Sequence, residues 1–104
     1  MLRIAIVDDH QIVRAGFREM LADELGFAFP FEAASGEEAL QGLREHAVDV
    51  LLLDLSLPGQ SGIDVLRAAR QRYEKLRILV LSGFPEERYA LAMIRNGADG
   101  YLCK

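Results

Sequence analysis

The chain has 104 residues, of which 51% are hydrophobic and 27% charged, and its formal net charge is −4. This size and composition predict one globular domain with a single modest core and exclude a second domain. No apolar run approaches the roughly 20 residues of a membrane span, and the first residues lack the features of a signal peptide. We therefore expect a cytoplasmic protein that does not contact membranes.

The cysteine and histidine content and the acidic charge exclude further classes. Cys103 is the only cysteine, so an internal disulfide is impossible, and His10 and His46 complete no zinc-binding spacing. An acidic domain is poorly suited to gripping a phosphate backbone over a broad surface. If DNA matters to this protein, another segment must bind it.

The first third of the chain alternates between strand and helix patterns. Residues 3–7 (RIAIV) predict a buried strand, and apolar residues at helical spacing over 12–21 predict a helix after it. Gly26 suits a left-handed helix end. Residues 27–34 (FAFPFEAA) predict a second strand. Because Pro30 cannot donate to a sheet ladder, this strand should lie at an edge.

The middle of the chain carries two helix-start signals. Ser35 and Ser61 each place a hydroxyl three positions before an acidic residue, at the start of an apolar helical pattern. They predict helices over 39–43 and 63–73. Between these helices, residues 48–53 (VDVLLL) form a continuous apolar run that is typical of a strand covered on both faces.

The last third repeats the same alternation. Residues 77–81 (RILVL) predict a fourth strand, and residues 90–94 predict a fourth helix with Pro85 in its first turn. Gly97 suits the left-handed end of that helix. Residues 98–103 supply a fifth strand. The whole pattern predicts a parallel sheet with right-handed connections.

Charged and hydroxyl side chains end several of these strands. Asp8 and Asp9 end the first strand, Asp54 the third, Ser82 the fourth and Lys104 the fifth. In an open parallel sheet, ligands bind beyond the carboxyl ends of the strands, so we expect these side chains in one crevice. Carboxylates about 4 Å apart repel by roughly 4 kcal/mol per pair at an effective dielectric near 20. Mg²⁺ would offset this repulsion, and a carboxylate so placed can attack phosphorus.

Four pieces of the sequence carry a family resemblance: VDDH, LLLDLSLPGQSG, VLSG and NGADGYLCK. In this order and spacing the chain resembles the receiver domain of a two-component response regulator, of the LuxR/NarL type. The resemblance spans residues 4–104. It implies a flavodoxin-like, doubly wound α/β fold with a five-stranded parallel sheet in the order 2-1-3-4-5.

The same resemblance implies a function and its partners. A sensor histidine kinase would donate the phosphoryl group, and the receiver would later hydrolyse its own acyl phosphate rather than turn over external substrates. Transcription would be regulated through a helix-turn-helix output domain that is absent from this chain. The metal-binding residues implied are Asp8, Asp9, Asp54 and the backbone carbonyl of Ser56. By this resemblance Asp54 would accept the phosphoryl group, and Lys104 and Ser82 would contact it. Ser82 and Tyr101 would form the switch, in which Ser82 moves toward the phosphoryl group and Tyr101 turns inward.

Most of these residues also have ordinary structural interpretations. Asp8 and Asp9 can cap the first helix, Ser82 can belong to a turn, and Tyr101 can be a core aromatic. His10 follows the acid pair, but a neutral imidazole matches Mg²⁺ poorly, so we expect it at the surface near the site.

Two rival functions remain open. A protein-interaction module could keep the fold and the acid pocket and act by docking alone, without phosphorylation. A haloacid-dehalogenase-type phosphatase also uses an aspartyl nucleophile, but after the first strand and with a second aspartate two residues on. The adjacent Asp8 and Asp9 lack that spacing.

The chain departs from the family at its end, because the family's receiver continues into a fifth helix and this sequence stops at Lys104. We therefore expect residues 1–104 to be a C-terminally truncated receiver domain with bared apolar side chains on its later strands. Such patches favour association. The chain should form a homodimer or a swapped oligomer, or be the ordered or excised part of a longer regulator.

Overall fold

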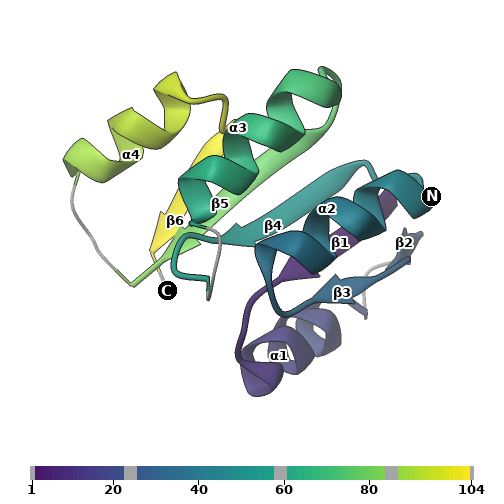
Figure 1. Cartoon of the computed structure of the whole chain (residues 1–104). Coiled ribbons are helices and arrows are strands. Elements are labelled where there is room, and N and C mark those ends of the chain that lie inside the picture. Colours follow the sequence, from purple (N-terminus) through teal and green to yellow (C-terminus); the bar gives the residue numbers. More distant parts are fainter. Residues whose placement is uncertain (1, 23–25, 58–60, 84–86, 104) are drawn as a thin grey trace.

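The structure, a computed structural model, describes residues 2–22, 26–57, 61–83 and 87–103 and consists of three layers (Figure 1). A parallel sheet forms the middle layer, with helix α1 on one face and helices α2, α3 and α4 on the other. The elements in chain order are β1 (Leu2–Val7), α1 (Gln11–Ala22), β2 (Phe27–Ala28), β3 (Glu32–Ala33), α2 (Gly36–Glu45), β4 (Val50–Asp54), α3 (Gly62–Arg72), β5 (Arg77–Ser82), α4 (Glu87–Arg95) and β6 (Gly100–Cys103).

The sheet has the order β2-β1-β4-β5-β6, and β3 also pairs with β1. All of its pairings are parallel. The predicted order 2-1-3-4-5 is confirmed, with β4, β5 and β6 as the third, fourth and fifth strands. The prediction of one continuous strand over 27–34 is wrong. The segment pairs with β1 at Phe27 and again at Glu32, and Pro30, which has no N–H to donate, lies in the gap.

The two predicted helix starts are confirmed. The Ser35 hydroxyl accepts a hydrogen bond from the Glu38 backbone N–H at 3.2 Å, and the Ser61 hydroxyl accepts one from the Asp64 N–H at 3.3 Å. Each bond satisfies a donor that the first helical turn leaves unpaired. The prediction for Pro85 lies outside the described residues.

The two glycines predicted at helix ends have left-handed backbone conformations, with φ of +86° at Gly26 and +112° at Gly97. At Gly97 the surroundings also demand glycine, because a Cβ there would lie 2.6 Å from Cγ of Arg70. Gly97 directly follows the last turn of α4, where a left-handed residue ends a helix.

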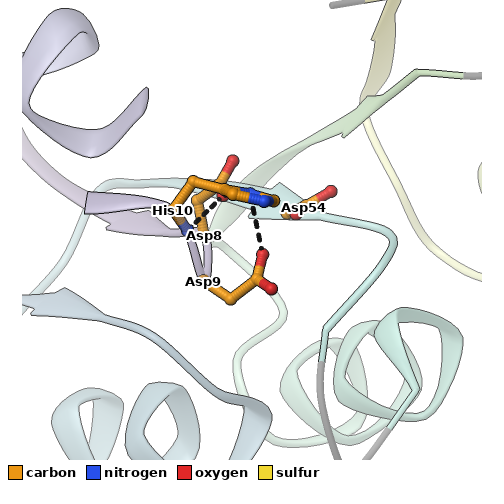
Figure 2. Close-up of side chains that lie close together, drawn as sticks. All are labelled: Asp8, Asp9, His10 and Asp54. Atoms are coloured by element: carbon orange, nitrogen blue, oxygen red, sulfur yellow. Dashed lines mark hydrogen bonds and ion pairs between the residues drawn. The ribbon is translucent and has the colours of Figure 1, made fainter. Parts of the chain in front are cut away.

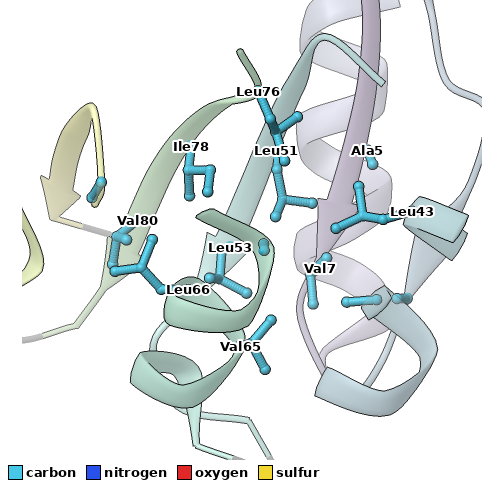
Figure 3. Close-up of a cluster of buried hydrophobic side chains, with 14 of the residues drawn as sticks. Ala5, Val7, Leu43, Leu51, Leu53, Val65, Leu66, Leu76, Ile78 and Val80 are labelled. Carbon is cyan, nitrogen blue, oxygen red and sulfur yellow. The ribbon is translucent and has the colours of Figure 1, made fainter. Parts of the chain in front are cut away.

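The core has a larger and a smaller half, one on each face of the sheet. Alternate strand residues such as Val7, Leu53 and Val80 face α2 and α3, where they pack with Val65 and other helix side chains (Figure 3). The smaller half contains the buried residues Ile4, Ile6, Leu52 and Leu81, against which α1 packs. Helices cover both faces of the sheet, and this explains why the strand sequences are continuous apolar runs.

Apolar side chains are exposed on β6 and on two helices. Leu102 is aligned with Leu81 of the smaller core half but is 49% exposed, and Ile12 of α1 is 87% exposed. Exposure of Leu102 agrees with the expectation of bared apolar residues on the later strands, while self-association itself stays a prediction. Within the described ranges, no helix has both the length and the apolarity to cross a membrane.

Candidate functional site

Three aspartates lie together at the carboxyl edge of the sheet because of the strand register. Asp54 is the last residue of β4, and Asp8 follows β1. The residues before them, Val7 and Leu53, are aligned as neighbours in the ladder. Asp8 and Asp54 are therefore level with each other on adjacent strands, with Asp9 next along the chain (Figure 2).

Two of these carboxylates are buried, with Asp8 0% and Asp54 2% exposed. Burial of a charge is costly unless hydrogen bonds or a counter-charge compensate it. The Asp8 Oδ1 accepts the His10 backbone N–H at 2.9 Å, and the Asp54 Oδ1 accepts the Ser56 backbone N–H at 3.2 Å. In each case the donor lies two residues further on, which is the geometry of an Asx turn.

The aspartates form one cluster with a histidine. One potential ligand atom from each of Asp8, Asp9, His10 and Asp54 lies within 4.8 Å of all the others. The His10 Nδ1 is 3.1 Å from the Asp8 Oδ1 and 3.0 Å from the Asp9 Oδ1 (Figure 2). Three carboxylates at this spacing repel one another unless a cation lies among them. Carboxylate oxygens are the ligands that hard divalent ions such as Mg²⁺ prefer, so the donor set fits that ion.

The two residues expected in the switch lie on neighbouring strands. Ser82 is 1% exposed and ends β5, one position beyond Leu81, which is aligned with Asp54. The structure thus brings Ser82 to the edge where the aspartates cluster. Tyr101 lies further back in β6, aligned with Val80, and packs half-buried against the larger core half.

Two of the remaining expected contacts cannot be placed in the same way. Lys104 lies outside the described residues. The backbone of Ser56 is described, and its N–H contacts Asp54, but a metal-binding role for its carbonyl stays a prediction.

The loop after Asp54 is fixed against the start of α3. The Gly62 N–H donates to the Leu55 carbonyl at 3.2 Å, and the Leu55 N–H donates to the Leu81 carbonyl at 2.9 Å. A Cβ on Gly62 would lie 2.4 Å from that Leu55 oxygen and 2.7 Å from the Leu55 Cα. Only glycine permits this approach, which holds the backbone next to the buried carboxylate in place.

Two contacts of the site were not predicted from the sequence. His10 is at the surface as expected, with its side chain 66% exposed, but it also contacts both members of the acid pair. The Arg14 guanidinium donates to the Asp8 backbone carbonyl and pairs with Glu32 at 3.2 Å. The one available signal for Arg14 was a charged residue among the apolar positions of the first helix.

A cavity of about 720 Å³ opens at the opposite, amino-terminal edge of the sheet, lined by residues such as Arg3, Asp49, Tyr73 and Lys75. Hydrogen bonds from the Arg3 side chain and backbone N–H hold the pKa of Asp49 down at about 2. This cavity does not include the aspartate cluster. We place the site at the cluster, because the carboxyl edge is where open α/β sheets bind ligands.

Comparison with known proteins shows the family of the chain. A family model described as "Response regulator receiver domain" matches residues 4–104. The chain belongs to this family. The expected fold and the receiver function are thereby confirmed, and the comparisons also bear out the resemblance to LuxR/NarL-type regulators.

Among the curated relatives of this receiver domain is the response regulator UvrY of Escherichia coli strain K12. It is 38% identical over 104 residues, which are 100% of this chain and 48% of that protein. The chain thus spans about half the length of the curated relatives it matches.

Solved structures give the same result. A LuxR-family two-component response regulator from Aurantimonas sp. SI85-9A1 is 40% identical, with a TM-score of 0.92 over 98% of this chain and 73% of that one. A Burkholderia pseudomallei response regulator, solved with a phosphorylated aspartic acid, a calcium ion and citrate, is 26% identical. Its TM-score is 0.89 over 100% of this chain and 60% of that one.

Proposed function

We propose that this receiver domain accepts a phosphoryl group on Asp54 from a phosphohistidine of a sensor kinase, with Mg²⁺ bound beside it. The observation that carries the proposal is the convergence of Asp8, Asp9 and Asp54 within one cluster at the carboxyl edge. The Burkholderia relative supports it, because its structure contains both a phosphorylated aspartic acid and a divalent cation.

The ion would be held by the carboxylates of Asp8, Asp9 and Asp54 and by the Ser56 carbonyl. When bound, it supplies positive charge that offsets the charge on the transferring phosphoryl oxygens. The apolar interior behind the carboxylates limits water on that side, which strengthens each electrostatic contact in the site.

The transfer itself is a nucleophilic displacement at phosphorus by Asp54. One carboxylate oxygen forms a bond to phosphorus while the phosphorus–nitrogen bond to the kinase histidine breaks, and the departing imidazole nitrogen takes a proton from solvent. The Ser56 N–H fixes the orientation of the Asp54 carboxylate through its hydrogen bond to Oδ1. Later attack of water on phosphorus releases inorganic phosphate and restores the carboxylate.

Signalling would follow as a shift between two conformations of the domain. Ser82 and Lys104 would contact the phosphoryl group, and Tyr101 would turn inward as Ser82 moves. The output would be transcriptional, through a DNA-binding domain in a longer regulator that works in the cytoplasm. The position of Ser82 at the end of β5, beside β4, supports this arrangement.

Beryllofluoride, a phosphoryl mimic, tests the proposal in the presence of Mg²⁺. We expect the amide NMR signals of the residues around Asp54 and Ser82 to shift in the unmodified chain and not in Asp54→Asn. Asp49→Asn is a matched control, because it removes one carboxylate from the opposite edge and should leave the response intact. A chain that does not respond to beryllofluoride would contradict the proposal and support a phosphorylation-independent docking module.

A further inference from the structure

We propose that Arg14 is a positioning residue of the metal site, which fixes the carboxylates of Asp8 and Asp9 by holding the backbone between β1 and α1. The inference rests on the proposed function, because it assumes that Mg²⁺ binds among the aspartates. It goes further by assigning a role to a side chain outside the cluster and to the second pairing of the edge segment, that of β3 with β1.

Three hydrogen bonds fix Asp8 from different sides. Its backbone N–H donates to the Ala33 carbonyl at 3.0 Å, and its carboxylate accepts the His10 N–H at 2.9 Å. Its backbone carbonyl accepts a hydrogen bond from the Arg14 guanidinium. That carbonyl belongs to the peptide group that joins Asp8 to Asp9. Because the orientation of this peptide determines where the Asp9 side chain begins, Arg14 acts on both members of the acid pair.

Arg14 is itself held in one orientation. Its backbone N–H donates to the His10 carbonyl at 3.1 Å, so its backbone and its side chain both contact the turn after β1. Its Nε donates to Oε1 of Glu32 at 3.2 Å, and the Arg18 guanidinium pairs with Oε2 of the same carboxylate. The side chains of Arg14 and Glu32 are only 16% and 23% exposed, so water and salt screen their contact less than they screen an exposed pair. A planar guanidinium bonded in this way presents its donors in a fixed direction.

The interrupted edge strand explains how Glu32 reaches this position. Pairing of the edge segment with β1 resumes at Glu32, which is aligned with Ile6, so β3 lies beside the carboxyl end of β1 (Figure 1). Both residues of β3 contact the site or its support. The Ala33 carbonyl accepts the Asp8 N–H, and the Glu32 carboxylate holds Arg14. The short strand β3 therefore supports the metal site as well as completing the sheet.

The alternative role for Arg14 is purely electrostatic. A guanidinium beside the acid cluster relieves repulsion among the carboxylates and repels an incoming cation. On charge alone, Arg14→Met would therefore raise the affinity for Mg²⁺. In the positioning role the same variant lowers that affinity, because carboxylates that are no longer held must be ordered when the ion binds. The two roles predict effects of opposite sign.

Calorimetric titration of the metal-free chain with Mg²⁺ measures that sign. We expect Arg14→Met to lower the affinity by about tenfold. Arg70→Met is the matched control, because Arg70 also donates to a backbone carbonyl, that of Gly97 at 2.8 Å, and pairs with a carboxylate, that of Asp99 at 2.7 Å. These contacts lie at the amino-terminal edge, so Arg70→Met should leave the affinity unchanged. An unchanged or raised Mg²⁺ affinity in Arg14→Met would overturn the inference.

Arg14→Lys separates charge from geometry in the same titration. The lysine keeps the positive charge, but it cannot bond the Asp8 carbonyl and the Glu32 carboxylate with one rigid, planar group. We therefore expect Arg14→Lys to bind Mg²⁺ about as weakly as Arg14→Met. Affinity equal to that of the parent chain in Arg14→Lys would contradict positioning by the guanidinium.

Glu32→Gln tests the role while the guanidinium stays in place. It should lower the Mg²⁺ affinity by a smaller factor than Arg14→Met does, and it should have no further effect when combined with Arg14→Met, because Glu32 acts through Arg14. The loss of a nearby negative charge would by itself have the same effect in both backgrounds. Equal factors in the two backgrounds would therefore count against the inference.

Carbon NMR of the metal-free chain gives a readout that does not depend on metal binding. The backbone carbonyl resonance of Asp8 should move in Arg14→Met and stay in place in Arg70→Met. Urea unfolding of both variants measures the stability that each loses, which separates a local change at Asp8 from partial unfolding. An unmoved Asp8 resonance in a folded Arg14→Met chain would contradict the inference.

One further variant separates failure of this inference from failure of the proposed function. If Asp54→Asn weakens Mg²⁺ binding and Arg14→Met does not, the inference fails and the proposed metal site stands. If Asp54→Asn binds Mg²⁺ as well as the parent chain does, the proposed metal site and the inference fail together.

Discussion

The two edges of the sheet hold their carboxylates in different ways. At the amino-terminal edge, Asp49 is bonded to Arg3 through two side-chain contacts of 3.0 Å, and Asp99 pairs with Arg70 at 2.7 Å. At the carboxyl edge, three aspartates lie close to one another, and the cluster includes one imidazole. At the amino-terminal edge these two aspartates are thus each paired with an arginine, whereas the carboxyl edge concentrates negative charge.

The pKa values at the amino-terminal edge show the consequence of pairing. Burial alone would raise the pKa of Asp99, but the Ile78 N–H and the charges of Arg70 and Arg77 outweigh it and leave that pKa below its usual value. These carboxylates contribute to stability through contacts within the chain. A cluster such as that of Asp8, Asp9 and Asp54 is better explained as a ligand site, because a bound cation would relieve the repulsion among its carboxylates.

The largest expected effect comes from removing one charge of the cluster. Asp8→Asn should lower the Mg²⁺ affinity at least about tenfold. In the absence of metal, the same variant should be more stable than the parent by about 0.5–2 kcal/mol, because repulsion within the cluster falls. Titration calorimetry and urea unfolding without metal measure the two quantities.

The control for this prediction is Asp49→Asn, which should leave Mg²⁺ affinity unchanged and should not stabilise the chain. If metal-free Asp8→Asn is less stable than the parent chain, the two edges do not differ as we describe.

The next largest effect concerns Gly62, the first residue of α3, which contacts the loop after Asp54. Gly62→Ala should destabilise the chain by about 1–3 kcal/mol, because the new methyl group would collide with the backbone of Leu55 rather than with a movable side chain. Gly16→Ala is a sharp control. It lies within α1, where a Cβ meets no atom within 4 Å, so it should stabilise the chain by about 0.5–1 kcal/mol. Unfolding curves that order the two variants the other way would contradict the packing described.

Removal of either helix cap should lower the unfolding free energy equally, but only one removal should change Mg²⁺ binding. Ser35→Ala and Ser61→Ala each remove one capping hydrogen bond and should each cost about 1 kcal/mol of unfolding free energy. Only Ser61 precedes the glycine that fixes the loop after Asp54, so only Ser61→Ala should also weaken Mg²⁺ binding. Equal metal affinities in the two variants would show that the loop does not depend on the start of α3.

The smallest expected effect is the acid sensitivity of the exposed pair at the amino-terminal edge. The pKa of Asp49 falls from 3.8 to about 2 on folding, so its contribution is fully present above about pH 4 and is lost as the pH falls toward 2. Asp49→Asn should make the stability less dependent on pH in that window. Unfolding midpoints measured between pH 2 and pH 5 test this, and identical slopes in the two chains would contradict it.

The sequence was sufficient where the deciding interaction is local. The hydroxyl caps at Ser35 and Ser61 act on backbone donors three residues away, and both were predicted. The apolar runs showed which residues follow the strand ends, and on that basis Asp8 and Asp54 were predicted to lie in one crevice.

Other features depend on contacts between distant segments and could not be predicted. Pro30 indicated an edge strand. That the segments before and after Pro30 each pair with β1 depends on contacts with a distant strand, which the sequence does not show. The strand predicted over 48–53 instead spans Val50–Asp54. In the site, the contact of His10 with both acids depends on the backbone path after β1.

Incubation with acetyl phosphate and Mg²⁺, followed by intact-mass measurement and peptide mapping, tests the central claim most directly. The account predicts that the chain gains the mass of one phosphoryl group, located on Asp54, and that Asp54→Ala gains none. An unmodified chain, or an Asp54→Ala variant modified to the same extent, would contradict it.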